Sequence, residues 1–363
     1  MKVCYIMGKE VKEKLGSSVM EVNMNYVKDF MEEILNIPSA GGNTKVVLNR
    51  VKEEFEALGI EVKTTKKGAV IGVFEGEDNE KQKIVCAHID TLGAMVKEIK
   101  PNGRLKLSNI GGFSWNSVEG ENLVIKTSSG AEYTGNLLPE KASVHIHPEE
   151  ARELIRTEEN MEVRIDEDIN SAEDAIKLGI RVGDFVTFET RTIVTNKGYI
   201  KSRYLDDKAC VAIIFGVCKY LKDNNIKPKN TILFYISNYE EIGHGVSIIP
   251  EEVDEFLALD IGTVGIGHKA DEHSVCICAK DNRTPYDFEF RNKLVEMAEE
   301  EKLNYKVDVY YRYASDASMA VLRGADVNFA CIGPGVDATH HYERTHIDAI
   351  EKTMKLVVKY ITK

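Results

Sequence analysis

The chain lacks the features that mark membrane, disulfide-rich or nucleic-acid-binding proteins. Its seven cysteines among 363 residues form no CxxC pair, so neither a disulfide framework nor a zinc finger is predicted. The longest apolar run, near residues 209–218, is far shorter than the ~20 residues of a membrane helix. The formal net charge of −12 offers no basic surface for phosphates. We therefore expect neither a nucleic-acid nor a membrane partner.

The beginning of the chain, MKVCYIMGKEVKEK, has too short an apolar core for a signal peptide. Together with the scattered cysteines, this predicts reduced thiols and a cytoplasmic location. The hydrophobic content of 43% and the charged content of 29% are ordinary for a globular protein. Residues 1–20 fit no predicted element.

Alternating helix and strand patterns predict an α/β fold, in which a mixed central sheet carries helices on both faces. Helical spacing in residues 22–34 and 46–58 is followed by strands that lead to His88, and the pattern resumes near Tyr199. Between residues 97 and 193 short β-like pieces alternate with glycine-rich turns, which is typical of a small barrel. We therefore predict a catalytic domain made of residues 1–96 and 194–363, with an all-β barrel-like domain of residues 97–193 inserted into it.

Acidic and histidine side chains recur where the predicted strands end or the predicted helices begin. In open α/β sheets the ligand site lies outside the carboxyl ends of the strands. Each group has an ordinary structural interpretation, because lone histidines and acids at such places mostly form hydrogen bonds, cap helices or face solvent. Their joint occurrence is the stronger signal. The groups are His88 with Asp90, Asp206, the pair Glu240 and Glu241, Asp260, and a histidine cluster of His340, His341 and His346.

Histidines and carboxylates together form the ligand set of borderline divalent ions. Two ions about 3.5–4 Å apart would be close enough for one carboxylate to bridge them. Such a site also needs a free carboxylate to take a proton from the attacking water. The pattern therefore predicts a two-metal hydrolase.

The ordered motifs resemble one family along roughly residues 23–360. The chain reads AHIDTLG, YLDDKA, YEEIGHG, LALDIG and YERTHIDAIE, where the family has AHxDxxG, D-D/N-R/K, EExG, an aspartate after an apolar strand, and a histidine before the last helix. The sequence thus looks like the cobalt- or zinc-dependent tetrahedral (TET) aminopeptidases, the glutamyl-aminopeptidase-like group often described as endoglucanase-like.

The resemblance implies a role for each matching residue. Asp206 would bridge two divalent ions, zinc or cobalt. Glu240 would be the general base of peptide-bond hydrolysis at the N-terminus, and Asp90 would orient its neighbours. The inserted domain would support assembly into a large homo-oligomer with interior active sites. The remaining ligands would be His88 and Asp260 for one ion, and Glu241 and His346 for the other.

Two questions stay open from the sequence. The chain departs from the family's usual Ser-Pro after the last histidine, having Ile347 and Asp348 there, so His340 or His341 is an alternative to His346. The sequence does not determine the substrate pocket either. A carboxypeptidase or an N-deacylase on the same scaffold would share the ligands, and a non-catalytic assembly protein would share the fold.

Overall fold

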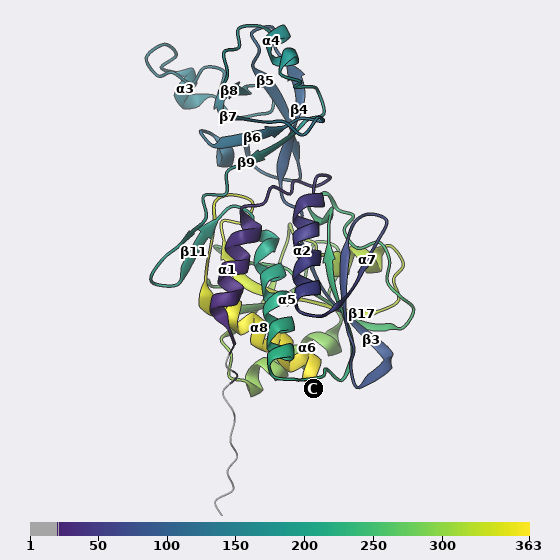
Figure 1. Cartoon of the computed structure of the whole chain (residues 1–363). Coiled ribbons are helices and arrows are strands. Elements are labelled where there is room, and N and C mark those ends of the chain that lie inside the picture. Colours follow the sequence, from purple (N-terminus) through teal and green to yellow (C-terminus); the bar gives the residue numbers. More distant parts are fainter. Residues whose placement is uncertain (1–19, 21) are drawn as a thin grey trace, which may run out of the picture.

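A twelve-stranded mixed sheet is the centre of the larger part of the molecule (Figure 1). The computed structural model describes residue 20 and residues 22–363. Residues 1–20, which fit no predicted element, therefore lie almost entirely outside the described residues. In spatial order the strands are β1 (Glu61–Thr64), β2 (Val70–Phe74), β12 (Asn230–Ser237), β3 (Asp78–His88), β13 (Val253–Leu259), β17 (Asn328–Asp337), β18 (Glu343–His346), β11 (Tyr199–Ser202) and β10 (Ile193–Val194), with β14 (Gly262–Val264) and β15 (Val275–Lys280) on β17 and β16 (Tyr305–Val309) on β15.

Helices cover both faces of this sheet, as the sequence predicted. Successive residues of β3 point to opposite sides: Val85 and Ala87 pack in the larger hydrophobic core, and Ile84 and Cys86 in the smaller one. One helix, α7 (Asp316–Leu322), packs in the smaller core. The helices of the larger core are α1 (Met24–Leu35), α2 (Lys45–Ala57), α5 (Leu205–Asp223), α6 (Phe288–Glu300) and α8 (Ile347–Thr362).

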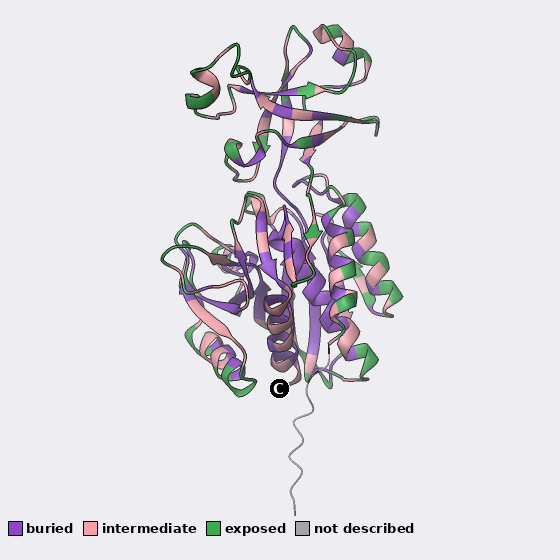
Figure 2. Ribbon diagram, turned by 90° about the vertical axis from the view of Figure 1, so that its left-hand side faces the viewer, coloured by how far each residue is buried: buried purple, intermediate pink, exposed green. Residues whose placement is uncertain are grey.

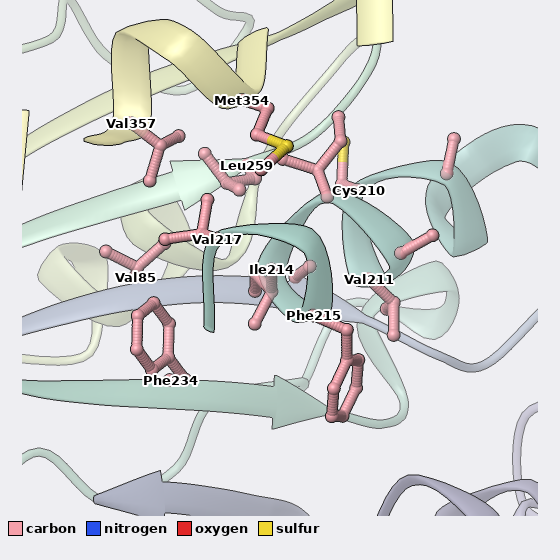
Figure 3. Packing of buried hydrophobic residues seen from close by; sticks show 14 of the residues in the cluster. Val85, Cys210, Val211, Ile214, Phe215, Val217, Phe234, Leu259, Met354 and Val357 are labelled. Atoms are coloured by element: carbon pink, nitrogen blue, oxygen red, sulfur yellow. The ribbon is translucent and has the colours of Figure 1, made fainter. Parts of the chain in front are cut away.

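Helix α5 is almost wholly buried and anchors the larger core. Ile214 of α5 lies near Phe234 of the sheet, and Met354 and Val357 of α8 pack in the same core (Figure 3). Phe215 packs against Phe30 of α1 and Phe55 of α2. Figure 2 shows that the strands of the sheet are largely buried, whereas the outer helices have an exposed face. Truncating Ile214 to alanine would cost about 2–5 kcal/mol. This packing fixes the first turn of α5 at the edge of the sheet.

A closed six-stranded antiparallel barrel projects from one end of the α/β part (Figure 1). Three short helices flank its strands: η1 (Trp115–Val118), α3 (Glu150–Glu153) and α4 (Ala172–Lys177). The predicted barrel-like insertion is thus present in the fold. Around the barrel the strands run β4 (Gly93–Ile99), β5 (Leu105–Ile110), β8 (Met161–Ile165), β7 (Glu132–Pro139), β6 (Asn122–Lys126) and β9 (Phe185–Phe188).

Four neighbouring strands of the sheet, β12, β3, β13 and β17, run parallel to one another. Their carboxyl ends therefore meet at the same edge, which is the edge that faces the barrel (Figure 1). Among the described helices, none combines the length and the apolar character needed to span a membrane.

Candidate metal centre

The residues that could bind metal lie where these parallel strands end. His88 is the last residue of β3, and Asp260 follows β13 directly. Glu240 and Glu241 begin a short 3-10 helix, η2 (Glu240–Ile242), just after β12. Asp206 lies in the first turn of α5. The sheet therefore brings side chains from distant parts of the sequence to one edge.

Asp206 lies between two histidines. Its Oδ1 is 3.2 Å from His88 Nε2, and its Oδ2 is 3.6 Å from His340 Nε2. The same His340 Nε2 is 3.4 Å from Glu241 Oε2. Ligand atoms of His88, Asp206 and Glu241 all lie within 4.8 Å of one another, as do those of Asp206, Asp207 and Asp260. Asp206 is thus shared by two groups of candidate ligands.

Both histidines of the cluster have a ring nitrogen free to bind a metal. His88 Nδ1 lies 3.0 Å from the carbonyl oxygen of Asp90, and His340 Nδ1 lies 2.5 Å from the carbonyl oxygen of Gly112. A carbonyl oxygen only accepts hydrogen bonds, so each Nδ1 carries a proton. Each Nε2 is therefore the ring nitrogen left for a metal. It points at Asp206, to which it donates a hydrogen bond in the metal-free protein, and a bound metal would displace that proton. Metal-binding histidines commonly have Nδ1–H bonded in this way.

His346 is not part of this cluster, although the resemblance implied that it would be a ligand. Its Nε2 donates to the carbonyl oxygen of Lys197 at 2.8 Å, and its Nδ1 accepts from the backbone N–H of Asp348 at 3.1 Å. Both ring nitrogens are therefore used, and His346 caps the N-terminus of α8. It lies at the far end of β18 and pairs with Tyr199 of β11, whereas His340 precedes that strand at the edge of the sheet.

Burial and mutual repulsion keep several of these acids from ionising easily. Burial, together with the charge of Asp260, raises the pKa of Glu240 well above its usual value. Burial raises the pKa of Glu241 to about 7. Burial alone would also raise the pKa of Asp206, but its hydrogen bonds to His340 and His88 lower it. A cluster of buried carboxylates is stabilised when bound cations neutralise its negative charge.

Two buried carboxylate oxygens of the cluster lack hydrogen-bond partners within the described part of the chain. They are Glu241 Oε1 and Asp207 Oδ1. An unpartnered buried acceptor costs about 1–3 kcal/mol, and more when it is charged. Carboxylate oxygens with imidazole nitrogens suit zinc or cobalt. The residues present therefore fit a divalent metal centre.

A set of buried carboxylates fixes the backbone around the site. The two oxygens of Asp90 accept from the backbone N–H groups of Glu240 at 3.0 Å and Glu241 at 3.2 Å. Glu343 accepts from the backbone N–H groups of Asp206 at 3.1 Å and His340 at 2.9 Å. Asp90 thus positions the glutamate pair, and Glu343 positions the two segments between which a shared ion would lie.

No role was assigned to Glu343 or to Asp207 from the sequence. Asp207 Oδ2 accepts from the backbone N–H of His88 at 3.1 Å, so it holds a ligand strand in place. The signal for Glu343 was its separation from His340, since a carboxylate three residues on can close back onto a backbone N–H. The predicted residues His88, Asp90, Asp206, Glu240, Glu241 and Asp260 do lie together.

Comparison with known proteins identifies the family and the fold. The model of the M42 glutamyl aminopeptidase family matches residues 68–356. YhfE of Bacillus subtilis, a predicted aminopeptidase, is 45% identical over 92% of this chain and 96% of its own length. A lysyl aminopeptidase of Pyrococcus furiosus is 26% identical over 59% of this chain and 60% of its own. The TET1 peptidase of Pyrococcus horikoshii, which can assemble into a tetrahedron or a large octahedral shell, shares the fold, with a TM-score of 0.77 at 20% identity over 93% of this chain and 99% of that one.

A sheet-edge cluster of histidines and acids beside an inserted barrel defines a peptidase scaffold with a candidate metal centre. The chain belongs to the M42 glutamyl aminopeptidase family. It is therefore a peptide hydrolase, and the expected resemblance is confirmed. The family also favours an aminopeptidase over the carboxypeptidase, the N-deacylase and the non-catalytic scaffold.

Proposed function

We propose that the protein is a dinuclear metal-dependent aminopeptidase. The observation that carries this proposal is the placement of Asp206, whose two oxygens face the Nε2 atoms of His88 and His340 at 3.2 and 3.6 Å. Asp206 would bridge two zinc or cobalt ions. His88 and Asp260 would complete one ligand set, and Glu241 and His340 the other. His340 thus replaces His346 in the ligand set that the family resemblance implied.

Glu240 is the proposed general base. Its carboxylate lies 3.8 Å from His88 Nε2, beside the ligands, where it would be within reach of a proton on the attacking water. When bound, the two ions would polarise the scissile carbonyl and lower the pKa of the attacking water. Glu240 would take a proton from this water and return it to the amine of the leaving peptide.

We infer that the barrel supports self-association into a large homo-oligomer. Two apolar side chains of the barrel, Ile146 and Ile155, are 71% and 78% exposed. Exposed large apolar residues commonly mark interaction surfaces. The shells formed by the TET1 peptidase of Pyrococcus horikoshii support the same proposal. The six described cysteines are free and buried, which fits a cytoplasmic protein.

The test is the release of amino acids from one defined peptide before and after metal removal. The metal-loaded protein should release the N-terminal residue first, a chelator should abolish release, and zinc or cobalt should restore it. Release from the C-terminus would contradict the aminopeptidase assignment. Full activity of the chelated protein would contradict the metal mechanism.

A further inference from the structure

Two arginines line the pocket that contains the candidate metal centre. This pocket has a volume of about 540 Å³, and its wall includes Asp206, Glu240 and Asp260 as well as Arg283 and Arg312. The proposed mechanism gives these arginines no role. A cation pair beside the place where the peptide would be cleaved is a candidate for substrate recognition.

Sheet topology explains why these two arginines line the same pocket. Arg283 lies in the loop after β15, and Arg312 lies in the loop after β16. The two strands are adjacent and parallel, so both loops leave the sheet at the same edge. The backbone N–H of Asn282 donates to the carbonyl oxygen of Tyr313 at 3.0 Å, which joins one loop to the other.

A buried aspartate makes the base of these loops rigid. Asp281 is fully buried, and its Oδ1 accepts from the backbone N–H of Arg283 at 2.7 Å. Its Oδ2 accepts from the Tyr286 hydroxyl at 3.0 Å, and that hydroxyl is 2.7 Å from Ser315 Oγ, the N-cap of α7. The backbone of Arg283 is therefore held in place, and the bond from Asn282 to Tyr313 ties its loop to the loop that carries Arg312, so less loop ordering is needed when a ligand binds.

Neither guanidinium forms an ion pair or a side-chain hydrogen bond with the described residues, although the chain has 59 acidic residues. Arg203, by contrast, pairs with Glu121 at 2.9 Å, and Arg344 pairs with Glu272 at 3.3 Å. A guanidinium presents a planar fork of donors that matches a carboxylate. Arg283 and Arg312 are thus free to accept an anionic group that enters the pocket.

We propose that Arg283 and Arg312 bind a carboxylate of the peptide substrate. This inference rests on the proposed function. The carboxylate has two chemical sources: the side chain of an N-terminal glutamate or aspartate, or the free C-terminus of a dipeptide. Family membership does not decide the preference, because the relatives include both a lysyl and a glutamyl aminopeptidase. Ile242 and Met319, which also line the pocket, would contact the apolar part of such a substrate.

The experiment compares kcat/KM for substrates that differ only in one carboxylate. The kcat/KM of glutamyl-p-nitroanilide relative to that of glutaminyl-p-nitroanilide tests recognition of a carboxylate on the first side chain. Leucyl-glycine against leucyl-glycinamide, followed by leucine release, tests the C-terminus. The wild-type protein, loaded with cobalt, should favour the carboxylate by about tenfold in one of the pairs. Arg283→Gln and Arg312→Gln should each reduce that ratio severalfold while leaving the neutral substrate within about twofold.

Arg164→Gln is the control, because Arg164 is an exposed barrel arginine outside this pocket, and it should leave both ratios unchanged. A change confined to the p-nitroanilide pair assigns the arginines to the first side chain, and a change confined to the dipeptide pair assigns them to the C-terminus. Wild-type ratios near one, or ratios that survive both substitutions, would overturn the inference while the proposed function stands. Absence of hydrolysis of all four substrates would overturn both.

Discussion

A histidine can bind a metal only when one ring nitrogen keeps its lone pair. His88 and His340 each donate through Nδ1 to a backbone carbonyl and turn Nε2 toward Asp206. His346 has used both nitrogens in hydrogen bonds to Lys197 and Asp348. The choice among the histidines near the end of the chain is therefore a matter of hydrogen bonding, which spacing in a sequence does not reveal.

The proposed base gives the first prediction at the residue scale. Glu240→Gln should keep its metal content and lower kcat by roughly two to four orders of magnitude, because the amide cannot take the proton of the attacking water. Metal content by mass spectrometry and kcat on a leucyl peptide are the measurements. The matched variant Glu241→Gln should instead lose bound metal. Near-normal turnover of Glu240→Gln would refute the assignment of the base.

Metal uptake should depend on pH through Glu241. Burial raises its pKa to about 7, and only the ionised carboxylate binds a metal, so cobalt should bind more weakly at pH 5.5 than at pH 7.5. In the metal-free protein the same group holds more protons when folded than when unfolded between pH 4.5 and 7, so its contribution to stability falls as the pH rises through that range. Isothermal titration at both pH values measures the affinity. Equal affinities would contradict this dependence.

At the scale of the secondary-structure elements, the long periodic segments could be predicted from the sequence. The meeting of the candidate ligands at one edge of the sheet could be predicted only in part. The strands before His88 and Asp260 were predicted from their apolar patterns, and the ligand site was expected at the carboxyl ends of such strands. The position of the loop that carries His340 could not be predicted, because it depends on Glu343. The Glu343 carboxylate accepts from the backbone N–H groups of His340 and Asp206.

Lys208 of α5 links two elements and gives a prediction at this scale. Its buried Nζ donates to the carbonyl oxygens of Ile34 at 2.8 Å and Ile37 at 2.7 Å, at and just beyond the end of α1. Lys208→Met should lower the free energy of unfolding by about 1–3 kcal/mol, because two carbonyls lose their donor. Urea unfolding measures the change. Lys222→Met, which removes a single exposed bond to Gly59, should stay within about 0.5 kcal/mol, and equal losses would contradict this account.

Considered as a whole, the molecule pairs an α/β peptidase part with a barrel that has its own buried core and carries the exposed apolar side chains Ile146 and Ile155. If the barrel drives assembly, the protein should elute at a multiple of its 40.7 kDa subunit mass. Ile155→Asp should shift the mass toward smaller species, since a buried charge weakens an apolar interface. Val46→Asp on α2, which also replaces an exposed apolar side chain, should not. Light scattering after gel filtration measures the masses, and a monomeric wild-type protein would rule out assembly.

The central claim is that His88, Asp206, Glu241, Asp260 and His340 hold two divalent ions at one edge of the sheet. Metal-to-protein ratios after loading with cobalt and gel filtration test it most directly, on the wild type, His340→Ala and His346→Ala. The account predicts two ions per subunit in the wild type and in His346→Ala, and a loss of at least one in His340→Ala. Loss of metal from His346→Ala with full retention by His340→Ala would contradict it.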